Sequence, residues 1–204
     1  MALSIILIHI SAILLAAGKS ERMGGPNKLL LTVQEQPMIA VTYQNLSSSI
    51  VYEIIVVTGR DADEVSRTLS LRPEDQLVHN ENYQLGMTTS IQKGVEQATG
   101  DAYMICLGDM PWLRATHYDR LMDQFHQSLE HSACQMLLPK VNGRRGNPVI
   151  FSNEYREEIL NHKEPEGCRG ILKAHPEKVS IWNTPEEAFI RDIDTPEDYK
   201  NNSQ

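Results

Sequence analysis

A short stretch after the first apolar run of the chain carries the residue types that bind phosphate. It contains Gly18, Ser20, Arg22 and Lys28. A glycine lets backbone N–H groups approach a phosphate, a serine adds a hydroxyl donor, and the two cations can neutralise a polyphosphate. Neither GxxxxGK[ST] nor GxGxxG occurs there, which argues against a Walker loop and a dinucleotide fingerprint. The stretch therefore predicts a phosphate site of another kind; the alternative is a turn with solvated charges.

Two aspartates farther along the chain could hold a divalent cation. Asp109 follows an apolar run, and a carboxylate at the end of a strand is well placed to hold Mg²⁺ against a phosphate. Asp194 precedes Thr195-Pro196, a good helix start, and we expect it to face Asp109 as a second metal ligand. We expect Asp192 to point to the opposite side of the chain, so the two acids should not serve equally. The alternative is that Asp109 belongs only to a turn, and that Asp192 and Asp194 only stabilise a helix N-terminus.

Polar residues in two other segments could contact a base, a ribose or a second substrate. After Gly86, the first turn of a predicted helix holds three hydroxyl residues, Ser90 among them, which could hydrogen-bond to a base or ribose, although an ordinary N-cap explains part of that run. Arg145 and Asn147 lie in one glycine-rich turn, and Arg169 lies in another. These arginines could receive an acceptor phosphate; solvated arginines at an exposed hairpin tip are the alternative.

The elements that must position these residues alternate between apolar runs and amphipathic stretches. The runs are blocks of Ile, Val and Leu, typical of strands covered on both faces. The alternation predicts a single domain, residues 1–204, of the α/β class, with a doubly wound, mostly parallel, Rossmann-like sheet. The turn within 141–149 predicts a small antiparallel insertion, and Asp61 and Glu64 have capping-box spacing. The expected strands are Ala12–Ala17, Glu53–Thr58, Gln76–Val78, Ala102–Leu107, Cys134–Leu138, Pro148–Phe151 and Val179–Trp182, and the expected helices are Pro37–Leu46, Asp61–Leu71, Thr88–Thr99 and Thr116–Leu129.

The composition excludes several other classes of protein. The net charge of −8 argues against general binding of DNA or RNA. Three cysteines lie far apart without a CxxC, which argues against a disulfide framework or a zinc site and fits a reducing cytoplasm. The apolar residues 1–17 lack a basic segment and include His9. We therefore expect neither a signal peptide nor a membrane span there.

Taken together, the motifs resemble the molybdenum cofactor guanylyl- and cytidylyltransferases, within the MobA-like NTP transferases. The resemblance rests on LAAGKSERMGGPNK, LGDMP, RGNPVIF and DIDTPEDY, in that order. It is closer to the cytidylyltransferase branch, because Ala17 stands where guanylyltransferases usually have glycine. By position, the resemblance implies that Arg22 and Lys28 hold the phosphates and that Asp109 and Asp194 bind Mg²⁺. It further implies a nucleotide site of Leu15, Ala16, Ala17, Gly18, Lys19, Ser20, Asn80 and Ser90, and an acceptor site of Arg145, Asn147 and Arg169.

The resemblance implies a cytoplasmic enzyme that transfers CMP from CTP to the phosphate of molybdopterin, with a molybdenum hydroxylase receiving the product. Two departures affect the acceptor side: Asn147 stands where relatives often have histidine, and Glu164 and Pro165 replace a Gly-Asp pair. Three alternatives stay open. They are a guanylyl- or other nucleotidyltransferase with a different phosphate acceptor, a non-catalytic carrier of the molybdenum cofactor, and an NAD(P)-binding oxidoreductase.

Overall fold

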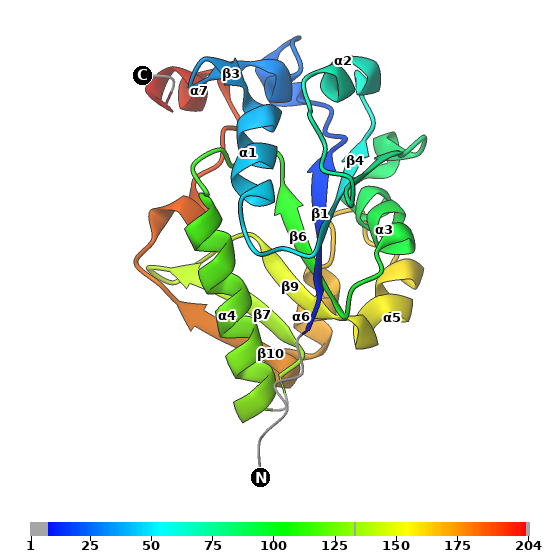
Figure 1. The fold of residues 1–204 in the computed structure, drawn as a ribbon, viewed down its shortest axis with the longest axis vertical. Coiled ribbons are helices and arrows are strands. Elements are labelled where there is room, and N and C mark those ends of the chain that lie inside the picture. The colour runs from blue at the N-terminus through cyan, green and yellow to red at the C-terminus, as the bar shows by residue number, and fades with distance from the viewer. Residues whose placement is uncertain (1–7, 133, 203–204) are drawn as a thin grey trace.

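A central, mostly parallel β-sheet runs through the molecule, with helices on both faces (Figure 1). The computed structural model describes residues 8–132 and 134–202. The strand order is β10-β7-β9-β6-β1-β4-β5, with β8 pairing β7. Strand β9 runs antiparallel to both of its neighbours, and the other pairs along this order are parallel. The strands are β1 (Ile10–Ala16), β4 (Glu53–Thr58), β5 (Gln76–His79), β6 (Ala102–Leu107), β7 (Met136–Val141), β8 (Arg144–Arg145), β9 (Val149–Ser152) and β10 (Val179–Asn183).

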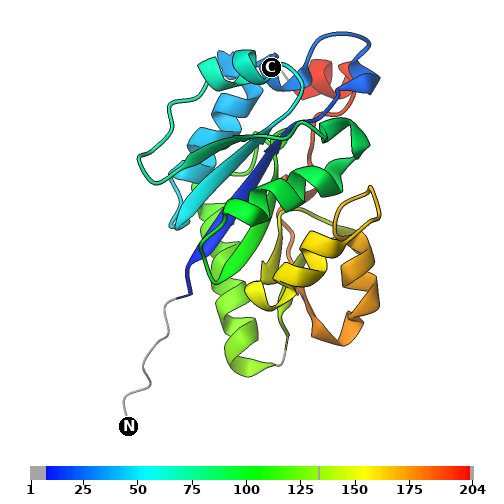
Figure 2. The same cartoon turned by 90° about the vertical axis from the view of Figure 1, so that its right-hand side faces the viewer.

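The helices form a layer on each face of the sheet (Figure 2). One layer consists of α1 (Met38–Ser47), α2 (Ala62–Arg67) and α4 (Ala115–His131), and the other consists of α3 (Met87–Gln97), α5 (Arg156–Asn161) and α6 (Arg169–Ala174). The last helix, α7 (Pro196–Asn202), lies beside the small hairpin of β2 (Thr32–Val33) and β3 (Gln36–Pro37), where the Tyr199 hydroxyl donates to the Thr32 carbonyl at 2.8 Å. No helix in the described ranges is long and apolar enough to cross a membrane.

Alternate side chains of the central strands enter two separate cores. In β1, Ala12 and Leu14 belong to the core beneath α1 and α4, whereas Ile13 belongs to the core beneath α3 and α5. In β4, Ile54 and Ile55 divide in the same way. Successive side chains of a strand point to opposite faces, so a strand covered on both faces must be apolar throughout. This explains why these strands were recognisable as continuous apolar blocks.

The predicted fold class is confirmed, with differences at short elements. The antiparallel insertion is β7–β8, closed by Asn142 and Gly143, whose φ values of 51° and 78° are those of a two-residue hairpin turn. The helix predicted over Asp61–Leu71 is only Ala62–Arg67, and its predicted capping box is wrong, because Asp61 has φ 53° and makes no side-chain cap. The hairpin β2–β3 and the short helices α5 and α6 were not predicted.

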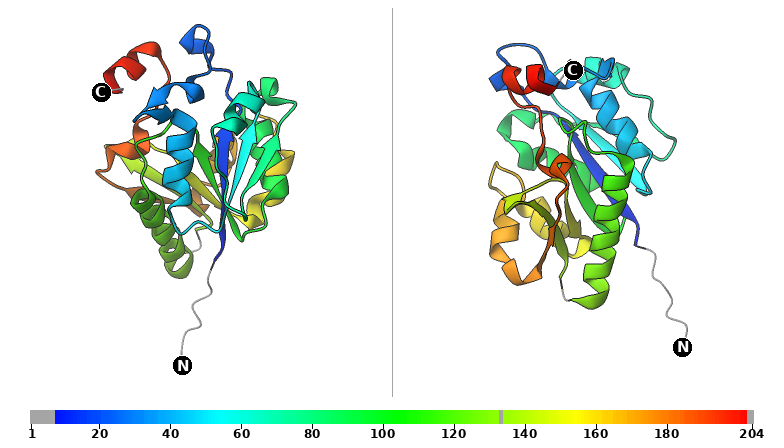
Figure 3. Two further views of the ribbon diagram at one scale, coloured as in Figure 1. Left: turned by 45° about the horizontal axis from the view of Figure 1, so that its top comes forward. Right: turned by 90° about the vertical axis from the view of Figure 1, so that its left-hand side faces the viewer.

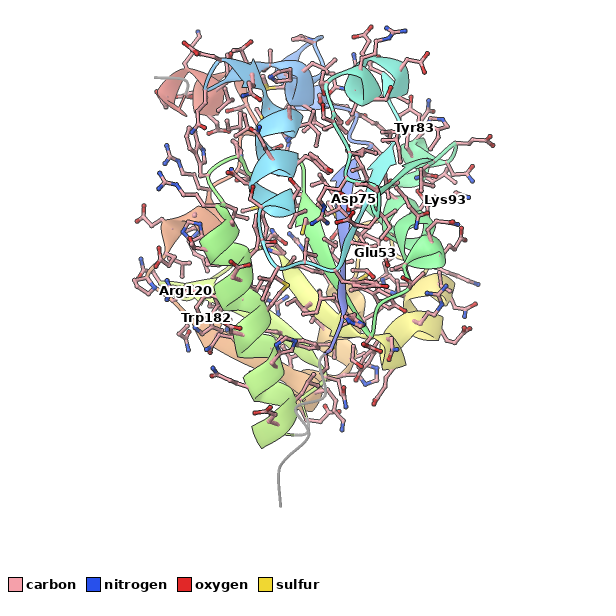
Figure 4. All side chains as sticks on the ribbon, viewed as in Figure 1. Glu53, Asp75, Tyr83, Lys93, Arg120 and Trp182 are labelled. Carbon is pink, nitrogen blue, oxygen red and sulfur yellow. The ribbon has the colours of Figure 1, made fainter. Side chains whose placement is uncertain are left out.

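A buried carboxylate joins α1 to strand β4 on one face of the sheet (Figure 4). Asp75 accepts two hydrogen bonds of 2.9 Å from the Arg72 guanidinium, one of 2.6 Å from the Tyr43 hydroxyl and one of 2.8 Å from the Ile54 N–H. Burial by itself would raise the pKa of Asp75, but these donors favour the carboxylate and lower the pKa overall. Burial and the bond to Asp75 raise the pKa of Tyr43 to about 12.

We expect Asp75→Asn to lower the free energy of unfolding at pH 7 by about 2 kcal/mol, since hydrogen bonds to a charged group are lost. A carboxyl whose pKa is lower in the folded state stabilises the protein above its unfolded pKa of about 3.9, and that stabilisation is lost as the pH falls through the folded value. Denaturant unfolding between pH 3 and pH 7 checks this. The difference between wild type and variant should shrink below about pH 4; a pH-independent difference would contradict the expectation.

Candidate active site

A cavity of about 800 Å³ opens where β1 and β6 end, at the edge of the sheet that Figure 3 (left) brings forward. The carboxyl ends of parallel strands are where ligands bind in doubly wound sheets. The loop after β1, the turn after β6, the start of α3 and the segment before α7 all reach this cavity. Of the residues singled out in the sequence, it is lined by Leu15, Ala17, Gly18, Lys19, Ser20, Arg22, Lys28, Ser90, Asp109, Asn147, Arg169, Asp192 and Asp194.

Three of the predicted site residues lie outside this cavity lining. Ala16 is fully buried in the core beneath α1. Arg145 is exposed on β8, paired with Lys140 of β7. The Asn80 side chain is used by its own surroundings: its amide donates to the Ser90 hydroxyl at 2.9 Å, so it orients a lining residue.

An ion-pair cluster occupies the part of the cavity next to β6. The Lys28 ammonium lies 2.5 Å from Asp109 Oδ2 and 2.6 Å from Asp194 Oδ1, and Arg22 pairs with the other oxygen of Asp194. Only 11% of the Lys28 side chain is exposed, against 72% for Arg22. Burial acts to lower the pKa of Lys28, but the two carboxylates raise it overall, so the lysine is charged. Residues that are distant in sequence thus form one compact set of opposite charges.

Asp109 is fixed by its backbone, and one of its oxygens is left without a partner. A β-carbon at Gly108 would lie 2.8 Å from the Leu15 carbonyl oxygen, so only glycine fits the step from β6 to Asp109. The Asp109 carbonyl accepts from the Ile193 N–H at 3.1 Å, which draws the segment before α7 toward β6. Asp109 Oδ1 is buried and has no hydrogen-bond partner among the described residues. A buried carboxylate oxygen without a donor is suited to a cation.

The carboxylates at this site suit a hard divalent cation that shares its coordination with a substrate. In residues 8–132 and 134–202, no three His, Cys, Asp or Glu side chains are grouped so as to hold a metal by themselves. Mg²⁺ is usually bound by one or two carboxylates together with phosphate oxygens and water, because it keeps an octahedral oxygen shell. Asp109 and Asp194 supply two such carboxylates beside two cationic side chains. The residues present therefore fit Mg²⁺ or a similar ion.

The expectation that Asp192 points away from the cavity is wrong. Asp192 lines the same cavity as Asp194, whereas Ile193 between them is fully buried in the core. Residues two apart share a side in an extended segment, and anchoring Ile193 leaves both acids facing the cavity. Burial and the negative charge of Asp109 raise the pKa of Asp192. The alternation Asp192-Ile193-Asp194 could have predicted this arrangement, because an apolar residue between two acids is expected to turn inward and leave both acids on the other side.

Another part of the cavity lining comes from residues 164–167, whose hydrogen-bond partners the sequence did not predict. The Thr88 hydroxyl donates to the Glu164 carbonyl and accepts from the Gly167 N–H at 3.0 Å, and Thr88 is 4% exposed. Gln92 of the same helix donates to carbonyls around the end of α5, at 2.9 to 3.0 Å. These bonds fasten residues 164–167 to the start of α3, so Arg169 reaches the cavity on a wall held by α3. The polar run before α3 signalled the hydroxyls but not their partners.

The fold and the site together define a nucleotidyltransferase. A family model described as the MobA-like NTP transferase domain matches residues 12–179. The chain belongs to the MobA-like NTP transferase family. The predicted membership, fold class and enzymatic nature are therefore confirmed.

Relatives span nearly the whole chain. Nicotine blue oxidoreductase of Paenarthrobacter nicotinovorans is 27% identical over 192 residues, 92% of this chain and 93% of the relative. Molybdenum cofactor cytidylyltransferase of Escherichia coli is 27% identical over 191 residues, 93% of each chain. Among solved structures, Rv0371c of Mycobacterium tuberculosis superposes with a TM-score of 0.79 at 20% identity, covering 95% of this chain and 97% of that chain. A second structure of Rv0371c is a complex with manganese, with a TM-score of 0.74 at 20% identity, covering 96% and 98% of the two chains.

Proposed function

We propose that this protein transfers CMP from CTP to the phosphate of molybdopterin and releases pyrophosphate. One oxygen of the acceptor phosphate forms a bond to the α-phosphorus, and the bond from that phosphorus to the pyrophosphate oxygen breaks. The observation that supports this most is the Lys28 ammonium between Asp109 and Asp194 at the carboxyl end of β6. The cytidylyltransferase of E. coli is a relative over almost the full length, and Ala17 lies in the cavity wall.

The cations of the site would exchange their ion-pair partners when a polyphosphate binds. In the structure, Lys28 and Arg22 neutralise the carboxylates. When CTP binds, its phosphates become the partners of these cations. A divalent ion, Mg²⁺ in our proposal, would be held by Asp109 and Asp194 and would supply charge neutralisation at the phosphates. The two cations thus move from protein carboxylates to the substrate without leaving the cavity.

The chemistry needs alignment more than proton transfer. The attacking phosphate is already an anion, so no strong general base is required, and catalysis rests on positioning and on neutralising charge. Lys28 would meet the charge that develops at the α-phosphate. Asn147 and Arg169, which line the same cavity, would receive the acceptor, and a molybdenum hydroxylase would take the product.

A thermal-shift panel tests the nucleotide half of the proposal. Wild type and Asp109→Asn are melted with Mg²⁺ and each of CTP, GTP, ATP and UTP. Binding at 100 times Kd stabilises by about 2.7 kcal/mol, which corresponds to a rise in Tm of about 5–10 °C for a chain of this length. We expect CTP to give the largest rise in wild type and little rise in Asp109→Asn.

Other results of the panel would redirect the assignment. A larger response to GTP would favour a guanylyltransferase, and a response to no nucleotide would favour a carrier of the cofactor. In a separate fluorescence titration, a change in NADPH emission when the protein is added would favour an oxidoreductase, the activity named for one relative. Once a nucleotide is identified, pyrophosphate release with molybdopterin as acceptor, against a sugar phosphate as a comparison, tests the acceptor half.

A further inference from the structure

An arginine that follows β4 binds the backbone of the loop after β1 by hydrogen bonds. The Arg60 guanidinium donates to the Lys19 carbonyl and, at 2.6 Å, to the Gly25 carbonyl. Lys19 lines the cavity, whereas Arg60 is not among the described residues that line it. Arg60 therefore contacts the loop from outside the cavity, and a single side chain fixes both ends of residues 19–25.

The same arginine is connected to the lysine of the ion-pair cluster. The Asn27 amide donates to the Arg60 carbonyl at 3.4 Å, and Asn27 Oδ1 accepts from the Leu29 N–H at 3.1 Å. The Ser20 hydroxyl accepts from the Lys28 N–H at 3.0 Å and donates to Asn27 Oδ1 at 3.4 Å. Asn27 is 4% exposed. The backbone of Lys28 is thus placed by a network of which Arg60 is one end.

The loop conformation needs such a brace. Ser20 has φ 55°, in the left-handed region that residues other than glycine avoid, and such residues persist where their surroundings hold them. The carbonyl and the following N–H of a planar trans peptide point in opposite directions. Holding the Lys19 carbonyl toward Arg60 therefore turns the Ser20 N–H away from Arg60, and Ser20 lines the cavity.

We propose that Arg60 is a positioning residue that holds the loop in the shape that receives the nucleotide phosphates. This inference rests on the proposed nucleotide site. Arginine suits the task because its planar fork reaches two acceptors at once, whereas lysine is a point charge. Asp61 Oδ2 lies 3.2 Å from Arg60 Nε and orients the guanidinium, which is why Asp61 does not cap α2.

The test compares Arg60→Met and Arg60→Lys with Arg67→Met. Arg67 is exposed on α2, and its side chain makes no hydrogen bond or ion pair with the residues that the structure describes, so Arg67→Met is the matched control. We expect Arg60→Met to raise the Kd of the Mg²⁺–CTP complex by about tenfold or more, since a displaced binding group costs one to two orders of magnitude. Arg60→Lys keeps the charge and one hydrogen bond, so it should fold and show a smaller rise. The control should bind like wild type.

Hydrogen exchange supplies a readout that is independent of nucleotide. Amides of residues 19–25 should exchange faster in Arg60→Met than in wild type, while amides of β6 and α4 stay protected. If Arg60→Met keeps the wild-type Kd and the wild-type exchange of this loop, the inference is overturned. A wild-type protein that binds none of the four nucleotides would instead contradict the proposed function. If Arg60→Met fails to fold, a wild-type Kd in Arg60→Lys overturns the inference.

Discussion

Replacing Lys28 by methionine is expected to lower turnover at least about 100-fold. The Lys28 ammonium lies within 2.6 Å of both Asp109 and Asp194 in a cavity at the carboxyl ends of the strands. In the proposed reaction it would contact the phosphates of bound CTP and would interact more strongly with the charge that develops on the α-phosphate in the transition state. Methionine keeps an unbranched apolar stem of similar length and removes only the charged end. We therefore expect kcat to fall far more than KM rises.

The same substitution is expected to change how a divalent ion affects stability. In wild type the ammonium lies between two carboxylates, so a bound ion must displace it. Without the ammonium the carboxylates repel each other, and an ion relieves the repulsion. Mg²⁺ or Mn²⁺ should therefore raise the Tm of Lys28→Met by more than it raises the Tm of wild type.

A lysine elsewhere on the molecule provides the control. Lys93 lies on α3 (Figure 4), and its side chain is 40% exposed and pairs with Glu96 at 3.5 Å. Lys93→Met should therefore keep wild-type turnover and the wild-type response to metal. Near-normal turnover in Lys28→Met would contradict its place in the mechanism. An equal metal response in Lys28→Met and wild type would contradict the displacement argument.

The sheet could be predicted because its strands are covered on both faces. Strand β4 was predicted at its observed bounds, Glu53–Thr58, since each of its six residues is buried. The short helices α5 and α6 were missed because six residues give too little periodicity to detect. The capping box predicted for α2 was wrong because the Asp61 carboxylate pairs with Arg60 and makes no side-chain cap at the helix N-terminus. Local sequence patterns indicate which residues are buried. They do not indicate which distant residue a polar side chain will contact.

The chemistry of the site was partly visible in residue types, whereas its geometry depended on distant pairs. Lys28 and Asp194 are 166 positions apart and meet because the Asp109 carbonyl binds the Ile193 N–H. The spacing of residues within either motif does not predict that contact. The partners of Arg60 and Thr88 could not be predicted for a related reason: both side chains donate to backbone carbonyls, which every residue possesses, so the sequence holds no sign of the acceptor.

We expect Asp109→Asn to lower turnover by about 10²–10³-fold and to raise the Mg²⁺ concentration needed for half-maximal activity. The amide keeps the size of the side chain and can still accept from Lys28, but it removes a negative charge and one of the two oxygens available to a cation. The buried Oδ1 of Asp109 has no partner among the described residues, so its replacement breaks no hydrogen bond that holds the fold.

Stability and activity should therefore separate in Asp109→Asn. The lysine retains Asp194 at 2.6 Å, so the Tm should change by only a few degrees. Asp123→Asn, at an exposed position of α4, is the control for replacing an aspartate as such. Full turnover in Asp109→Asn at low Mg²⁺ would contradict the metal assignment. If excess Mn²⁺ partly restores the lost turnover, the result would support the metal assignment. The restoring cation would then bind at the site where the Asp109 carboxylate normally helps to hold it.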